Sequence, residues 1–155
     1  MARPFQFQLL LDQAVRQSED ASRVMMTCRA DWLNAEQKLQ QLEGFRQEYR
    51  LRLCHTEQSG ISVNQWRDYQ AFIAKIDVAI RQQQEAINFA KTCFEQARDR
   101  WQTLENQVGA YRKLETRHHH QEQHRELKRE QKMNDEFSAR ASGQAAARHD
   151  DIDMS

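Results

Sequence analysis

Four histidines in the second half of the chain are the residues whose type and spacing come closest to a metal-binding pattern. His118, His119 and His120 form a run, and His124 lies four residues after His120. On a helix the last two would share a face, where two imidazoles can hold a transition metal weakly. Only Glu122 lies nearby to complete such a set. We therefore interpret the run as a solvated polar segment and predict no metal site.

Nothing else in the sequence has the pattern of a catalytic or cofactor-binding site. A phosphate-binding glycine-rich loop, a zinc-type spacing of Cys or His and a Gly-x-Ser-x-Gly nucleophile elbow are all missing. Cys28, Cys54 and Cys93 are isolated thiols, and an odd number without metal-type spacing is typical of a reducing compartment. The sequence therefore predicts a protein that is not an enzyme, with no catalytic residue and no cofactor.

Charge and hydropathy argue against two classes of partner. The chain has 23 basic and 23 acidic residues, so no net field favours a nucleic acid or an anionic membrane. No apolar run approaches the roughly 18 to 20 residues that cross a bilayer, and residues 9–11 are too short for the core of a signal peptide. We expect a cytoplasmic protein that binds no nucleic acid and does not insert into the membrane.

Two long helices are the elements that position these side chains, and each is marked by an apolar stripe. In both stripes apolar residues recur at alternating steps of four and three, which is the heptad pattern of a coiled-coil seam. The first seam is Phe7, Leu11, Ala14, Ser18, Ala21, Met25, Cys28, Trp32, Ala35, Leu39, Leu42, Arg46, Tyr49 and Leu53. The second seam is Trp66, Tyr69, Ile73, Ile76, Ile80, Gln83, Ile87, Ala90, Phe94, Ala97, Trp101, Leu104, Val108 and Tyr111. With 39% hydrophobic residues, four Gly and one Pro, the chain has little material for a compact core and little to interrupt a helix.

A short turn separates the two seams. Residues 57–62 hold a central glycine, in a region that has no other turn signal. Ser62, followed three residues later by Gln65, is a capping-box pattern that begins a helix. We therefore predict helix one at about 5–56, a turn at about 57–62 and helix two at about 63–140.

Folding the chain back at this turn matches the two seams along their whole length. The facing pairs include Ser18 with Trp101, Ala35 with Gln83, and Met25 with Phe94. A parallel homodimer would instead stack each tryptophan on its own copy and leave alanines facing each other across voids. We therefore prefer an all-α fold in which the two helices form an intramolecular antiparallel coiled-coil hairpin.

The second seam has no apolar continuation, because the next positions in register are Glu115 and His118. Residues 112–140 are rich in helix formers and opposite charges but have no stripe to bury. They are either a single-helix extension or a segment that becomes ordered on a partner. We expect residues 142–155 to be a disordered tail, and the coiled-coil domain to cover residues 1–141.

Apolar side chains off the seam widen the stripe near the turn. Phe45, Phe72 and Ala79 lie outside the heptad positions but next to them. Because a two-helix coiled coil has no third layer to cover them, we predict an exposed apolar patch that docks a partner. The alternative is that a third segment of the chain or a second copy covers these side chains.

Three groups of residues form a combination that is hard to obtain by chance. They are Glu48-Tyr49-Arg50, then Gly60-Ile61 with Asn64, Trp66, Tyr69-Gln70 and Phe72-Ile73, and finally Asp135-Glu136-Phe137. With these groups the chain resembles, from about residue 10 to 141, the FliJ family of flagellar export proteins. The resemblance implies a cytoplasmic component of the flagellar type III export apparatus, similar to the stalk of rotary ATPases and peripherally associated with the cytoplasmic face of the inner membrane at the flagellar base.

The resemblance also implies partners and a binding face. The partners would be the hexameric export ATPase, the cytoplasmic domain of the export-gate membrane protein, and export chaperones. The family's gate-binding face maps onto Leu42, Phe45, Tyr49, Phe72, Ile76, Ala79 and Gln83, which is the patch near the turn. Two other interpretations are a general export chaperone and a plain coiled-coil scaffold without ATPase coupling. The sequence leaves open which end of the hairpin would enter the ATPase ring.

Overall fold

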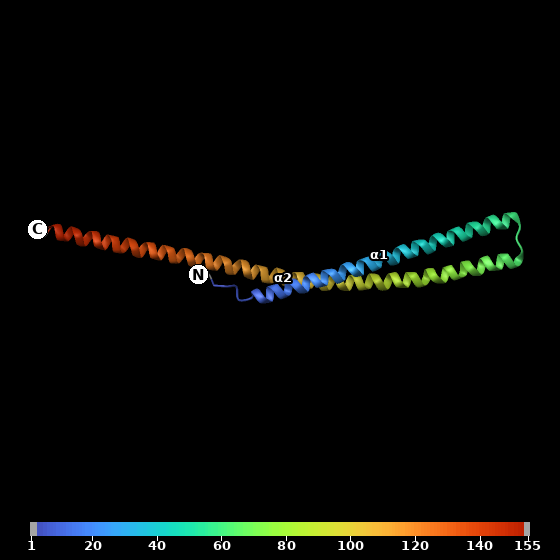
Figure 1. Cartoon of the computed structure of the whole chain (residues 1–155), viewed down its shortest axis with the longest axis horizontal. Helices are drawn as coiled ribbons and strands as arrows, with labels where there is room; N and C mark the ends of the chain where they lie inside the picture. The colour runs from blue at the N-terminus through green and yellow to red at the C-terminus, as the bar shows by residue number, and fades with distance from the viewer. Residues whose placement is uncertain (1–2, 154–155) are drawn as a thin grey trace. The chain divides into compact units, whose positions relative to one another are not determined.

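The fold consists of two long helices. The computed structural model describes residues 3–153, in which α1 spans Gln8–Ser59 and α2 spans Val63–Asp153. This described part of the chain contains no strand, and neither of its helices is long and apolar enough to cross a membrane. α1 leads into a tight turn, from which α2 returns beside α1 (Figure 1). The predicted all-α helical hairpin is confirmed.

Contacts divide the chain into two compact units. The turn unit, Val15–Asn106, contains most of α1, the turn and the first part of α2. The terminal unit contains the described residues of the two chain ends, 3–14 and 107–153. Each unit therefore holds a part of α1 and a part of α2, and the heptad seam is shared between them.

Local chemistry at the turn fixes where the helices end and begin. Gly60 follows the last residue of α1 with a φ of 84°, a left-handed conformation that favours glycine. Ser62 caps α2, because its hydroxyl oxygen accepts the Gln65 N–H at 3.2 Å and its own N–H donates to the Gln65 side chain at 3.4 Å. α2 therefore begins at Val63, as the capping-box pattern predicts. α1 continues past the predicted end near residue 56 to Ser59.

Seam residues form the interior of the turn unit. From Ser18 to Leu104 every seam residue is buried or half-buried, with one exception. The exception is Trp66, which is 42% exposed and whose indole N–H donates to the Glu57 carboxylate at 2.9 Å beside the turn. The buried part of the seam on α2 therefore starts one position later than the sequence predicts.

The polar members of the seam are paired across the two helices. The pairs are Arg46 with Asp77 at 3.1 Å, Gln83 with the main-chain oxygen of Ala35 at 2.8 Å, and Ser18 with Glu105. Because a polar group withdrawn from water is costly without a partner, each pair favours this register over a shifted one. The contact between Ala35 and Gln83 joins two residues that the fold-back register predicts to face each other.

One aromatic contact differs from the predicted facing pairs. Phe94 is predicted to face Met25, but its ring centroid lies 5.6 Å from that of Trp32. Helical side chains lean toward the N-terminus of their own helix. In antiparallel helices Trp32 and Phe94 therefore lean toward each other, and the rings meet although the residues are not directly opposite.

The outer ends of both helices differ from the prediction. α2 continues to Asp153, whereas the sequence predicts an end near residue 140 and a disordered tail over 142–155. The segment contains no proline and includes Ala145–Ala147, so the backbone can extend the helix without a tertiary partner. Residues 154 and 155 lie outside the described part of the chain. α1 begins at Gln8 rather than near residue 5, because residues 3–7 take a non-helical path along α2.

Candidate docking surfaces

The predicted patch separates into exposed and covered residues. Phe45 is 52% exposed and Phe72 is 43% exposed, and both lie in the turn unit. Ala79, which we expect to be exposed, is half-buried, and Ile76 belongs to the buried core. The remaining members of the predicted face are all half-buried, namely Leu42, Tyr49 and Gln83. Two phenylalanines are therefore the large apolar side chains that this patch leaves exposed.

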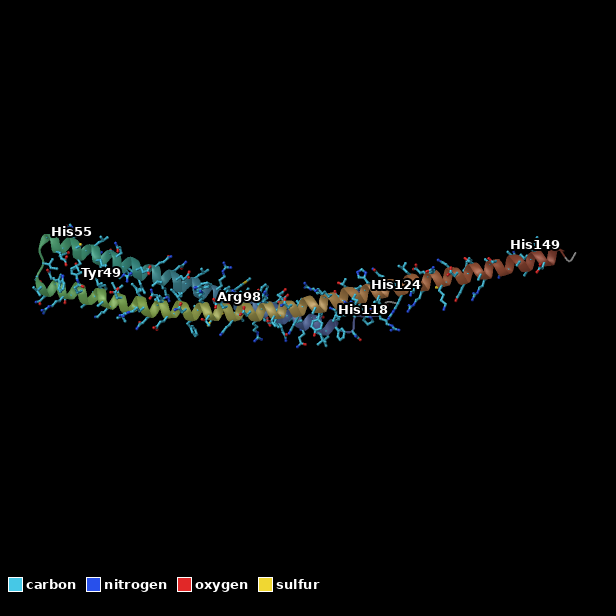
Figure 2. All side chains as sticks on the ribbon, turned by 180° about the vertical axis from the view of Figure 1, so that it is seen from behind. Tyr49, His55, Arg98, His118, His124 and His149 are labelled. Carbon is cyan, nitrogen blue, oxygen red and sulfur yellow. The ribbon has the colours of Figure 1, made fainter. Side chains whose placement is uncertain are left out.

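Phe72 is exposed but held in place. Its ring centroid lies 4.4 Å from that of Tyr49, with 48° between the ring planes. Arg52 covers the Tyr49 ring at 5.3 Å from its centroid, a cation–π contact. Tyr49 lies between the two helices near the turn (Figure 2). One side of Phe72 is thus occupied by packing, whereas Phe45 has no aromatic contact of this kind in the described residues.

The two flanks of the seam in the turn unit have different chemistry. Phe45, Phe72 and Ala79 each lie one position before a seam residue that follows a step of four. All three therefore lie on the same flank of the seam. On this flank Val24, which is 56% exposed, lines a small pocket together with Ala21 and Ala97. The opposite flank is polar and carries Arg29, Glu36, Glu43, Arg50, Asp77, Lys91, Arg98 and Glu105. The first flank also carries Asp31, Lys38, Arg52 and Arg100, so it is apolar only locally, at Val24 and at Phe45, Phe72 and Ala79.

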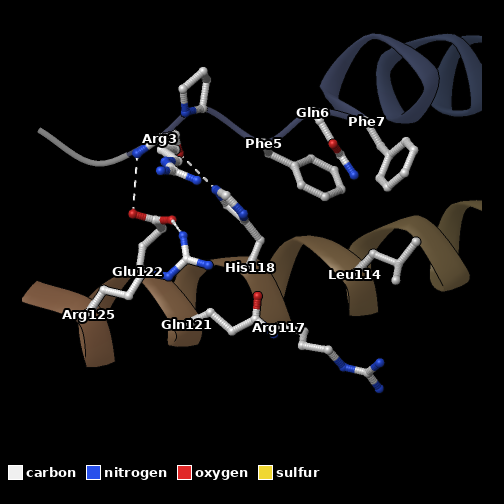
Figure 3. Close-up of a pocket in the computed structure, with 11 residues that line it drawn as sticks. Arg3, Phe5, Gln6, Phe7, Leu114, Arg117, His118, Gln121, Glu122 and Arg125 are labelled. Carbon is white, nitrogen blue, oxygen red and sulfur yellow. Dashed lines mark hydrogen bonds and ion pairs between the residues drawn. The ribbon is translucent and has the colours of Figure 1, made fainter.

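A second surface, in the terminal unit, involves the residues before α1. We call residues 3–7 the strap, because they lie along α2 (Figure 3). The Arg3 N–H donates to a Glu122 carboxylate oxygen at 3.3 Å, and the Arg3 carbonyl lies 2.8 Å from Nε2 of His118. The Phe5 ring packs 5.7 Å from the His118 ring. The strap therefore contacts α2 through its main chain and through one aromatic side chain.

The Glu122 carboxylate is the centre of these contacts. Its side chain is only 8% exposed, and it also accepts a hydrogen bond from Arg125 at 3.0 Å. The hydrogen bond from the Arg3 N–H holds the pKa of Glu122 below its usual value against the opposing effect of desolvation, and the positive charges of Arg125, His118 and Arg3 lower it further by smaller amounts. Glu122 is therefore stabilised in its charged form while the strap is docked.

This surface is not predicted from the sequence. Glu115, His118 and Glu122 continue the alternating steps of four and three beyond the last apolar seam residue, and they are half-buried or buried. The signal was present in the spacing, but polar residues at seam positions do not predict burial when no apolar partner helix faces them. The aromatic pair Phe5 and Phe7 just before α1 was the complementary signal.

The histidines and cysteines follow no common arrangement. His120 and His124 are exposed on α2. Among the residues that the structure describes, no group of three or more His, Cys, Asp or Glu side chains could hold a metal ion. Cys28, Cys54 and Cys93 are free thiols, of which Cys54 is exposed.

Together these features define a coiled-coil hairpin protein, in which paired helices carry an exposed aromatic patch and a polar, strap-covered face. The sequence model of the family described as "Flagellar FliJ protein" matches residues 3–147. The Flagellar FliJ protein of Escherichia coli (strain K12) is 31% identical over 133 residues, which cover 86% of this chain and 90% of the relative. The Flagellar FliJ protein of Salmonella typhi is 29% identical over 142 residues, 92% of this chain and 97% of the relative. The chain belongs to the FliJ family and is a component of the flagellar export apparatus.

Proposed function

We propose that this protein acts as the stalk and regulator of the hexameric flagellar export ATPase and links that ATPase to the export gate. The observation that carries the proposal is the pair of exposed phenylalanines, Phe45 and Phe72, beside a seam that is buried or half-buried from Ser18 to Leu104 except at Trp66. Large exposed aromatic side chains on a well-packed element are typical of protein-binding sites. Membership of the FliJ family supports a place in the export machinery.

In this proposal the two units have different partners. The patch Leu42, Phe45, Tyr49, Phe72, Ile76, Ala79 and Gln83 binds the cytoplasmic domain of the export-gate membrane protein, and Phe45 and Phe72 make the main contacts. Ile76 and Gln83 support the patch from inside, since Ile76 is buried and Gln83 already donates to Ala35. The charged helix of the terminal unit, exposed at every residue over 123–150, contacts the ATPase ring.

We further propose that the protein has no enzymatic activity of its own and alters the activity of its partner. It would act on the cytoplasmic side of the inner membrane at the flagellar base, held there by the gate. Binding of export chaperones is a secondary role. A general export chaperone without ATPase coupling is the main competing function, and it requires no effect on ATP turnover.

A titration into the purified export ATPase tests this proposal. The ATPase is kept below the concentration at which its ring assembles, and phosphate release is measured as the protein is added. The protein alone should release no phosphate, whereas ATPase turnover should rise and saturate near roughly one chain per six ATPase subunits, as a single stalk in a closed ring requires. Phe45→Asp is the matched control, because it alters the gate patch and should stimulate like the wild type. Unchanged turnover over the whole titration would favour the chaperone function.

A further inference from the structure

The strap, residues 3–7, covers a face of α2 in the terminal unit, and the way it is held indicates that it can be replaced. We propose that this face is a binding site for an extended peptide segment of the export ATPase, and that the strap occupies it until that segment displaces it. The inference rests on the proposed function, because it takes the ATPase as the partner. The face consists of Leu114, His118, Gln121, Glu122 and Arg125, which line one open pocket with the strap (Figure 3).

The first reason is that α2 recognises main-chain atoms of the strap. Glu122 accepts a hydrogen bond from the N–H of Arg3, and His118 contacts the carbonyl oxygen of Arg3. These two side chains therefore bind both main-chain polar groups of one residue. Every residue except proline offers both groups in an extended conformation. The face therefore requires an extended backbone rather than the particular side chain of Arg3.

The second reason is that few contacts hold the strap against α2. Besides the two contacts of Arg3, these are limited to the tilted packing of Phe5 on His118. The edge-to-face contact of Phe5 with Phe7 lies within the strap, and the main-chain hydrogen bonds from Gln8 to Phe5 and from Leu11 to Phe7 tie the strap to α1 rather than to α2. The pocket that the strap forms with α2 is open and has a volume of about 320 Å³. Segments with few buried contacts open at a small fraction of the global unfolding free energy. A competing segment can therefore displace the strap without unfolding the helices.

The third reason is the chemistry that release would uncover. Without the strap, the Glu122 carboxylate would lose its main-chain donor, and the His118 imidazole and Leu114 would gain exposure. The Arg125 guanidinium would still neutralise Glu122 from one side only. A replacing segment must supply an N–H donor to Glu122, an acceptor to His118 and an aromatic or aliphatic side chain for the pocket, and an extended peptide supplies all three.

The test uses full-length variants that change only the strap. Arg3→Pro deletes the N–H that donates to Glu122, and Arg3→Ala is its matched control, because it keeps that N–H while removing the side chain. Phe5→Ser removes the contact with His118. Each protein is titrated into the export ATPase, and hydrogen exchange of the Gln8 amide, which donates to the Phe5 carbonyl oxygen at 3.2 Å, is measured in the free protein.

We expect Arg3→Pro and Phe5→Ser to lower the half-saturating concentration at least about threefold relative to the wild type, since they remove the competing strap. The same two variants should lose hydrogen-exchange protection at Gln8, whose amide is hydrogen-bonded to the strap, and Arg3→Ala should change neither quantity. If Arg3→Pro behaves like Arg3→Ala, or if it binds the ATPase more weakly, the strap does not compete and the inference is wrong. If wild-type protein has no effect on the ATPase, the proposed function fails and the ATPase is not the occupant, while hydrogen exchange still reports whether the strap closes.

Discussion

The turn unit and the terminal unit use the same heptad positions with different chemistry. In the turn unit these positions hold residues such as Ile73, Ile76 and Ile80, which are buried against the partner helix. In the terminal unit the positions after Tyr111 hold Glu115, His118 and Glu122, and a short strap contacts the last two. The free energy gained by apolar burial depends on the buried apolar area and is nearly independent of side-chain orientation. The polar contacts, in contrast, require particular donors and acceptors in a defined geometry.

This difference indicates how stability and binding are divided. The apolar seam supplies most of the folding free energy and keeps the exposed phenylalanines of the patch in position. The polar face of the terminal unit contributes local order that can be gained or lost without unfolding the rest. Changes in the turn unit should therefore affect global stability, and changes at the strap should affect local exchange and partner binding.

The largest expected effect is at the centre of the apolar seam. Ile80 is only 4% exposed, so Ile80→Ala should lower the free energy of unfolding by about 2 to 5 kcal/mol, through lost burial and the cavity left behind. Glu122→Gln should leave the global unfolding midpoint nearly unchanged, because it affects only the strap. Urea unfolding followed by circular dichroism measures both. Equal losses would show that the two units are not divided in this way.

A smaller effect is expected at the turn. Gly60 has space for a methyl group, but its φ of 84° makes alanine unfavourable by roughly 1 to 2 kcal/mol. Gly44 is the matched control, because it lies inside α1 with nothing within 4 Å of an added Cβ, so Gly44→Ala should stabilise the protein by up to about 1 kcal/mol. Thermal melting of the two variants should shift in opposite directions. Shifts of the same sign would contradict this account of the turn.

The smallest expected effect is the pH dependence of strap docking. The pKa of Glu122 is lowered from 4.5 in the docked state. The charged carboxylate therefore makes its full contribution to strap docking at pH values above 4.5. This contribution weakens as the pH falls below that value and is lost once the pH passes the lower pKa of the docked carboxylate. Amide chemical shifts of Phe5 and Gln6 should follow this acidic step.

Three neighbouring groups also carry charge near this carboxylate, namely Arg3, His118 and Arg125. The acidic step must therefore be assigned to the carboxylate by a variant. In Glu122→Gln the step below pH 4.5 should disappear. A step of unchanged size in this variant would mean that another carboxylate controls docking.

Most of the fold could be predicted from the sequence because its causes are local or periodic. The alternating steps of four and three predict both seams, and Ser62 with Gln65 predicts the first residue of α2. Gly60 marks the turn because its left-handed backbone conformation disfavours residues other than glycine, which is again a local cause. The pairing of Ala35 with Gln83 follows once the register is fixed.

The remaining features depend on contacts that a periodic pattern does not contain. The strap is non-helical, so heptad spacing gives no register for it, and its partners Glu122 and His118 are polar. The extension of α2 to Asp153 depends on the weak preferences of many exposed residues, which do not define an end.

The affinity of the protein for the purified cytoplasmic domain of the gate protein tests the claim that the aromatic patch of the turn unit binds the export gate. Phe45→Asp places a charge in the proposed interface but alters only an exposed side chain, so melting should stay within about 0.5 kcal/mol of the wild type. Binding should become about a hundredfold weaker or worse, because the charge would be desolvated without a partner. Phe89→Asp is the matched control, since Phe89 is 74% exposed on the same unit but lies outside the patch, and it should bind like the wild type. Equal affinities of the two variants for the gate domain would contradict the claim.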